Sequence, residues 1–392
     1  MMLEGDCKSC LKETAQNNIK LLRLGQRTTC PELYALPRGA EKVHGEFVSS
    51  LNAGDWGFIL VRGYNGAGKS VYIKYLERIA NAYGYAINHV EVDSELIKQY
   101  GAPKYFSLQM FNTIRLPDGE MLLYKILRDE KFRDKLHTIV EKNFADFDFY
   151  SSALAQILLL ATDNSSENKG QRNNAVSWLK GEPKYVMELR DMGVFDKTMK
   201  SILDVPTSKL LYSMKDLIQH LGCKGLLVSV DEIEKAGELP VIKGRETLSV
   251  IRDLINILTS EDSLPIKRGT MKGLFIAYAI STFYLGYSGV IEVEGVDFRA
   301  QADQYGKPKV TIQEMPRLST MLRDSGAMIS ADFGSIEDIK SIAAKIIPCY
   351  SFTNSRNISL TADELAKQSF EITNDFLARP NVMAMIRILD KV

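Results

Sequence analysis

Apolar and polar positions near the start of the chain follow the pattern of a strand, a loop and a helix. The short apolar run at residues 58–61 predicts a buried strand. From Lys69 onward, apolar residues such as Ile73 and Leu76 recur at helical spacing until Gly84 offers a stop signal. The pattern therefore predicts a strand that passes through a short loop into an amphipathic helix.

Three further β-prone runs continue this arrangement. They are residues 85–92, 225–230 and 273–280. Segments with helical spacing stand between them, among them residues 246–258. Strands that alternate with helices are typical of an α/β fold with a parallel sheet, which is the fold class that we predict.

The stretch between the second and third of these strands is much longer than one helical crossover requires. Residues 104–219 are rich in helix formers and predict a mostly helical insertion. Within it, residues 163–174 are polar and poor in apolar side chains, which predicts an exposed loop. A partner or nucleic-acid contact and a plain solvated connection both remain open for this loop.

The last part of the chain carries two helix start signals, at Ser335 and Thr361, and a final apolar-spaced run at residues 382–389. We interpret it as a small helical or winged-helix lid. The predicted organisation is an N-terminal extension at 1–45, a core at 46–330 that contains the insertion at about 104–219, and the lid at 331–392.

Composition changes this picture little. The 392 residues are 45% hydrophobic and carry 49 basic and 49 acidic side chains, so no overall charge attracts nucleic acid or membrane. The N-terminus lacks the pattern of a secretory signal, and no apolar run is long enough to cross a bilayer, so we expect a cytoplasmic protein. Five cysteines are too few for a disulfide scaffold. Cys7 and Cys10 form one C-x-x-C, which Cys30 and His44 could complete as a zinc site, but a lone C-x-x-C lacks the second half of the usual signature, so ordinary free thiols are the favoured interpretation.

The loop after the first strand is the most informative motif. Residues 63–70 match the phosphate-loop pattern G-x-x-x-x-G-K-[ST]. In such a loop the backbone N–H groups and the N-terminus of the helix face the β- and γ-phosphates of a nucleotide, the lysine adds positive charge and the hydroxyl binds Mg²⁺. The predicted nucleotide-binding residues are Gly63, Tyr64, Asn65, Gly66, Ala67, Gly68, Lys69, Ser70 and Val71. A chance glycine-rich turn is the alternative.

The strand at 225–230 ends in Asp231 and Glu232, as a Walker B strand does. We expect Asp231 to hold Mg²⁺ together with Ser70, and Glu232 to orient and deprotonate the attacking water. The alternative is an ordinary acidic loop, because the charged run continues through Glu234 and Lys235.

The strand at 273–280 ends in Ser281 and Thr282. In ring-type ATPases a polar residue at this strand tip senses the γ-phosphate, and either hydroxyl is a candidate for that role. A plain strand end with turn-forming hydroxyls is an equally good interpretation.

Several short motifs beyond these carry a resemblance to a known family. They are Leu22 to Gly25 with Pro31, the loop from Val61 to Ser70, Trp178 to Glu182, Lys224 to Glu234, Arg379 with Pro380, and Ile386 to Asp390. With these the chain resembles the ATP-binding P-loop proteins of bacteriophage-exclusion (BREX) systems, a branch of the AAA+ superfamily. It departs from the family in having Ser70 where threonine is usual and an arginine before, instead of after, the late proline.

The resemblance implies an AAA+-type P-loop ATPase that uses ATP and Mg²⁺ and acts as a motor or switch in a defence complex directed at foreign DNA. It also implies other defence-system proteins as partners, possible contact with double-stranded DNA, and assembly of like subunits on ATP binding. Arg379 is then a candidate lid residue at the nucleotide, and Arg317 or Arg323 a candidate arginine finger, with surface arginines as the alternative.

Three other functions remain open at this point. The first is a nucleotide-gated scaffold with little turnover, and the second is a signal-transducing ATPase. The third is a DNA-remodelling ATPase of the transposition-regulator type. A local basic cluster could support the last of these, but acidic residues are interleaved with it and a solvated helix face is the favoured interpretation of the cluster. The cluster consists of Lys180, Lys184, Arg190, Lys197 and Lys200.

Overall fold

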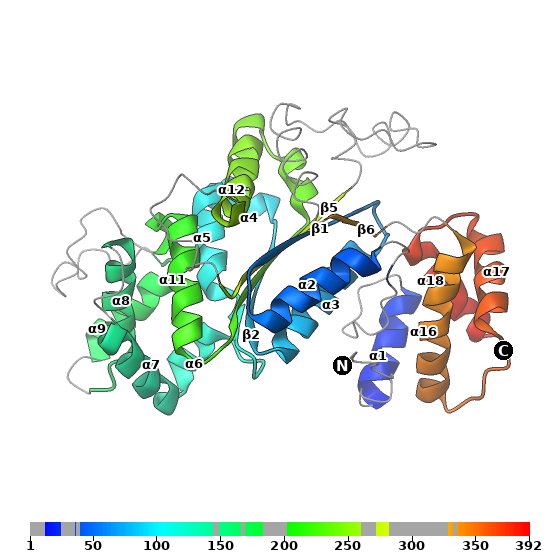
Figure 1. Ribbon diagram of the computed structural model, residues 1–392, viewed down its shortest axis with the longest axis horizontal. Coiled ribbons are helices and arrows are strands. Elements are labelled where there is room, and N and C mark those ends of the chain that lie inside the picture. Colours follow the sequence, from blue (N-terminus) through cyan, green and yellow to red (C-terminus); the bar gives the residue numbers. More distant parts are fainter. Residues whose placement is uncertain are drawn as a thin grey trace.

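The computed structural model describes residues 12–24, 36, 40–143, 149–165, 169–182, 202–259, 272–281, 328–331 and 335–392. A twisted sheet lies in the middle of the molecule with helices on both faces, and a separate group of C-terminal helices stands beside one end of the sheet (Figure 1). The chain is therefore an α/β protein with a helical unit attached.

The sheet has six strands in the order β3-β2-β4-β5-β1-β6. The strands are β1 (Gly57–Gly63), β2 (Tyr85–Glu91), β3 (Ile114–Arg115), β4 (Gly225–Asp231), β5 (Leu274–Ser281) and β6 (Met328–Ser330). The four strands that the apolar runs predict are confirmed. All pairs are parallel except β2 with β3, so the predicted parallel sheet is confirmed apart from one antiparallel edge strand. Strand β3 has only two residues, too short to give a periodic signal.

Each face of the sheet has its own hydrophobic cluster, because successive side chains of a strand point to opposite faces. Ile59 and Val61 of β1 face helices α2 (Glu41–Ala53) and α3 (Lys69–Ala82). Phe58 and Leu60 face the other cluster, which the remaining helices of the core build. Those helices are α4 (Ser94–Tyr100), α5 (Ala102–Asn112), α6 (Leu122–Arg128), α7 (Glu130–Asn143), α8 (Phe149–Thr162), α9 (Lys169–Leu179), α11 (Thr207–His220) and α12 (Val241–Thr259), with the short 3₁₀ helix η5 (Ile202–Asp204).

Helices α6 to α9 lie between α5 and α11, where the sequence predicts a mostly helical insertion, but the loop predicted there is wrong in part. Residues 163–165 do lie outside helices, whereas Lys169 to Asn174 belong to α9. The polar first half of α9 continues into Ala175, Trp178 and Leu179, which are buried and belong to the cluster that α8 also builds. Burial of that end stabilises a helix that its local composition does not predict.

The C-terminal unit consists of α16 (Ile336–Asn354), α17 (Ala362–Thr373) and α18 (Ala378–Leu389). Both predicted start signals are confirmed. The Ser335 hydroxyl accepts the N–H of Asp338, and Thr361 forms a capping box with Glu364. No strand occurs in residues 335–392, all of which the structure describes, so the unit is helical and not a winged helix.

The first described helix, α1 (Lys12–Arg23), packs against this C-terminal unit. Ile19 belongs to the same hydrophobic cluster as α16, α17 and α18, and Arg23 donates two hydrogen bonds to the carboxylate of Asp390, at 2.9 and 2.6 Å. The predicted N-terminal extension, residues 1–45, thus contributes α1 to the C-terminal unit and the first residues of α2 to the helices that cover the sheet.

No helix in the described part of the chain is long and apolar enough to cross a membrane.

Strands β4 and β5 approach each other so closely at their start that a side chain does not fit there. A Cβ atom on Gly225 would lie 2.0 Å from the carbonyl oxygen of Gly273. Because backbone must move to relieve this contact, Gly225→Ala is expected to lower the free energy of unfolding by about 3 kcal/mol in urea denaturation. Gly45→Ala is the control, since a Cβ there meets nothing within 4 Å. Equal stability of both variants would contradict the close approach.

Candidate functional site

The loop between β1 and α3 has the backbone of an anion-binding turn. Gly66 and Gly68 have φ values of 90° and 99°, a left-handed conformation that favours glycine. The N–H of Ala67 donates to the carbonyl of Tyr64 at 3.1 Å, which closes the turn. Gly68 is the N-cap of α3 and supplies no side-chain cap, so the N–H groups of the first turn and the positive end of the helix dipole remain available to a ligand.

Lys69 is the first residue of α3, and backbone carbonyls of the loop hold its side chain in place. Its ammonium donates to the carbonyl oxygens of Gly63 and Tyr64, at 3.1 and 3.3 Å. The residue is 7% exposed. A cation this well buried requires a negative partner, because it has lost most of its hydration.

The acidic segment that follows β4 folds back toward the loop. Asp231 ends β4 and is buried, and its Oδ1 accepts the N–H of Glu232 at 2.9 Å. Glu232 has a φ of 60°, an unusual conformation for a residue other than glycine, and it starts the 3₁₀ helix η6 (Ile233–Glu238). Because a 3₁₀ helix has three residues per turn, Glu232, Lys235 and Glu238 share one side of it.

The partner of Lys69 is Glu234, which the sequence analysis does not assign to the site. Glu234 Oε1 lies 3.6 Å from Lys69 Nζ, and its Oε2 accepts the backbone N–H of Ser281 at 3.2 Å. Burial raises the pKa of the Glu234 carboxyl above its usual value. Lys69 opposes that rise, whereas Glu232 and Asp231 add to it.

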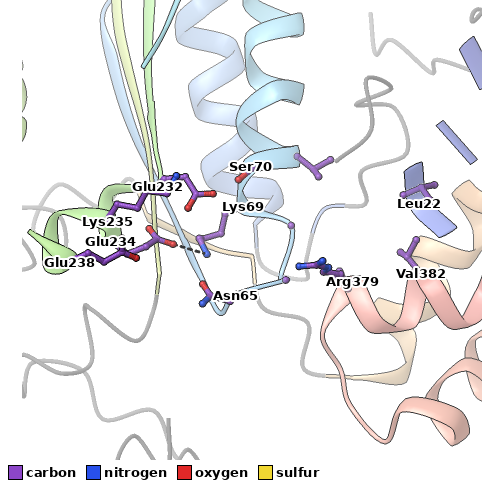
Figure 2. A pocket seen from close by; sticks show the side chains of 14 residues that line it. Leu22, Asn65, Lys69, Ser70, Glu232, Glu234, Lys235, Glu238, Arg379 and Val382 are labelled. Carbon is purple, nitrogen blue, oxygen red and sulfur yellow. Dashed lines mark ion pairs between the residues drawn. The ribbon is translucent and has the colours of Figure 1, made fainter. Parts of the chain in front are cut away.

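These groups surround a cavity of about 530 Å³ between the sheet and the C-terminal unit. Figure 2 shows the acidic side chains of η6 on one side, Lys69 and Ser70 at the loop, and Arg379 with Val382 and Leu22 on the opposite side. The cavity is lined by Leu22, Asn65, Gly66, Gly68, Lys69, Ser70, Val71, Glu232, Glu234, Lys235, Glu238, Ala378, Arg379 and Val382. One side is thus charged and the other is largely apolar.

Helix α18 touches the loop directly. The backbone N–H of Arg379 donates to the carbonyl of Gly66 at 2.9 Å. A Cβ atom on Gly66 would lie 3.2 Å from the Cβ of Arg379, so glycine serves both the turn and this contact. The C-terminal unit therefore closes the cavity at the loop.

The structure brings most of the predicted site residues together. The predicted residues that line the cavity are Asn65, Gly66, Gly68, Lys69, Ser70, Val71, Glu232 and Arg379. Gly63, Tyr64 and Ala67 support the loop. Asp231 and Ser281 lie buried at the ends of their strands, next to the cavity lining but not part of it.

Some predicted site residues lie outside the described part of the chain, namely Thr282, Arg317, Arg323, Cys7, Cys10 and Cys30. His44, proposed with those cysteines as a zinc ligand, makes a 2.8 Å hydrogen bond to Tyr72 through Nδ1.

The lining residues that sequence reasoning missed are Leu22, Glu234, Lys235, Glu238, Ala378 and Val382. The spacing of three from Glu232 to Lys235 and Glu238 is that of a 3₁₀ turn and would have pointed to these two residues, but not to Glu234. No local pattern points to Leu22 or Val382, because they meet only through the packing of α1 on α18.

The residues present suit a nucleotide with its divalent cation. The loop provides N–H donors and one ammonium for phosphates, and Ser70 and Glu232 provide oxygen atoms of the kind that Mg²⁺ and its water ligands prefer. The described residues contain no group of three His, Cys, Asp or Glu side chains placed to hold a metal ion.

A comparison with protein families matches residues 124–321, about half of the chain, to the family described as BREX system ATP-binding protein BrxC/D. The chain belongs to this family. The matched BrxC/D region contains β4, η6 and β5, and hence Asp231, Glu232, Glu234 and Ser281, while the Gly63–Ser70 loop and the C-terminal unit lie outside it. A search of curated proteins found no match to the chain.

Membership of this BREX family gives the chain an ATP-binding role in defence against phage. It also agrees with the resemblance inferred from the motifs.

Proposed function

We propose that this protein is a Mg²⁺-dependent ATPase of the AAA+ type that works as a motor or switch in a BREX complex directed at foreign DNA. The observation that carries the proposal is the meeting of three elements at one cavity. These are the loop with Lys69, the acidic segment that follows β4, and Arg379 on α18. None of them is near another in sequence.

The sheet order explains why these elements meet. Strand β5 lies between β1 and β4, and all three are parallel, so their carboxyl ends share one edge of the sheet. That edge is where ligands bind in open α/β sheets. The register pairs Gly63 with Ser281, which puts the proposed γ-phosphate sensor beside the start of the loop.

Each residue then has a chemical role in the proposal. The loop amides and Lys69 neutralise the phosphates, and Ser70 and Asp231 would hold Mg²⁺. When bound, Mg²⁺ would neutralise part of the phosphate charge. The Glu232 carboxylate orients the attacking water and takes its proton. Ser281 or Thr282 reads the γ-phosphate.

The apolar side of the cavity suits the base of the nucleotide. Leu22, Val71 and Val382 come from α1, α3 and α18 and line the same space as the loop. Apolar walls with a few polar groups are typical of small-ligand sites. We therefore assign α16, α17 and α18 as a lid, and α1 as part of its nucleotide-facing wall.

Arg379 is the one arginine that lines the cavity among the residues that the structure describes. In this proposal Arg379 is the lid residue at the nucleotide, so the arginine finger is a different residue, and we propose that Arg323 of a neighbouring subunit supplies it on ATP-driven assembly. The partners in this proposal are further copies of the chain, other BREX proteins and double-stranded DNA.

Steady-state ATP hydrolysis tests this function, measured with Mg²⁺, with EDTA and with double-stranded DNA, together with the mass in solution with and without ATP. We expect Mg²⁺-dependent turnover, an ATP-dependent increase in mass, and stimulation by DNA if DNA is the substrate of the motor. ATP binding without turnover under every condition would contradict the proposed ATPase activity and support the nucleotide-gated scaffold.

A further inference from the structure

One carboxylate connects the phosphate-binding lysine to the tip of a different strand, and the proposed reaction gives it no role. Glu234 Oε1 is 3.6 Å from Lys69 Nζ, and Oε2 accepts the Ser281 N–H at 3.2 Å. The ion pair is drawn as a dashed line in Figure 2. The side chains of Lys69 and Glu234 are only 8% and 13% exposed, so water screens the pair weakly.

The geometry shows why Lys69 requires this partner. A lysine ammonium has three N–H donors, and two of them meet the carbonyls of Gly63 and Tyr64. Carbonyl oxygens carry only partial charge, so Glu234 provides the full negative charge that a buried cation needs. Within the described residues Glu234 is the one carboxylate in ion-pair distance of Lys69.

A nucleotide phosphate and Glu234 compete for the same ammonium. We propose that Glu234 is a built-in counter-ion of Lys69 that the phosphates of the nucleotide displace, so that it opposes binding and, on leaving, releases the backbone of Ser281. This inference rests on the proposed ATP site. It makes Glu234 a positioning residue that links occupancy of the loop to the end of β5.

Displacement follows from charge. With phosphates on Lys69, the Glu234 carboxylate would lose its cation and face an anion at close range. Glu232 and Asp231 already add negative potential there. If the Glu234 carboxylate turns away from Lys69, this repulsion is removed. The side chain belongs to a short 3₁₀ helix in which Lys235 is partly exposed and Glu238 is exposed, so the movement leads toward solvent.

The test compares Glu234→Gln with the wild-type protein in equilibrium binding of the non-hydrolysable ATP analogue AMP-PNP with Mg²⁺. Glutamine has the same length and its amide oxygen can still accept the Ser281 N–H, but it carries no charge. We expect binding to become about tenfold tighter or more, because the competition for Lys69 is removed. The matched control is Glu238→Gln, which lines the same cavity without an ion pair to Lys69 and should change affinity less than about twofold.

The outcomes separate this inference from the proposed function. If the wild-type protein does not bind AMP-PNP, both fall. If it binds, and folded Glu234→Gln binds equally or more weakly, the counter-ion role is wrong while the ATP site stands.

A measurement on the wild-type protein needs no variant and covers the case in which Glu234→Gln does not fold. Hydrogen exchange resolved to single amides should show that AMP-PNP accelerates exchange at Ser281 while the rest of β5 stays protected. Unchanged or slower exchange at Ser281 would overturn the release step.

Discussion

Replacement of Lys69 by alanine is expected to abolish measurable ATP binding, with a loss of affinity of about 100-fold or more. The ammonium is the one full positive charge that the loop itself contributes to the cavity, and it is held by two carbonyls and Glu234. The measurement is a calorimetric or fluorescence titration with ATP and Mg²⁺.

The controls for Lys69→Ala address charge and folding separately. Lys235→Ala removes a positive charge from the same cavity, but that lysine pairs with Glu91 at 3.3 Å, so ATP affinity should change only a few-fold. Lys69→Ala leaves the buried Glu234 carboxylate without its cation and so lowers the free energy of unfolding. The double variant Lys69→Ala with Glu234→Gln removes both charges and should recover that stability without recovering ATP binding. ATP binding by Lys69→Ala at wild-type affinity would show that the nucleotide does not use this loop.

Replacement of Glu232 by glutamine is expected to lower kcat for ATP hydrolysis by about 1,000-fold while leaving ATP affinity within a few-fold. The carboxylate lines the cavity and is partly exposed, and the change removes a base while it keeps a side chain of the same length. Steady-state and single-turnover hydrolysis assays measure the effect.

Glu238→Gln is again the matched control, because it removes another carboxylate of η6 from the same cavity. Its kcat should remain close to that of the wild-type protein. Hydrolysis by Glu232→Gln at the wild-type rate would exclude Glu232 as the base and direct attention to Glu234.

The sequence predicts the elements of this protein where local signals are strong. The apolar runs at β1, β2, β4 and β5, the glycine loop, and the caps at Ser335 and Thr361 each depend on residues that are close together in the chain. For the same reason the Gly63–Ser70 loop and the Asp231–Glu232 pair are recognisable before any fold is known.

The features that sequence reasoning missed depend on contacts between distant segments. Glu234 reads as part of an ordinary charged run, and its role becomes visible only when β4 and β1 put it beside Lys69. Leu22 reaches the cavity because α1 packs on α16 and α18, far along the chain. The first half of α9 is polar and becomes helical through the buried residues that follow it. Tertiary packing decides each of these cases.

Isothermal titration calorimetry of the wild-type protein with ATP, with and without Mg²⁺, tests the central claim most directly. The account predicts one site per chain, tighter with Mg²⁺ than without it, and lost in Lys69→Ala. Absence of heat from ATP under both conditions, for a protein shown to be folded, would contradict the assignment of the cavity as a nucleotide site.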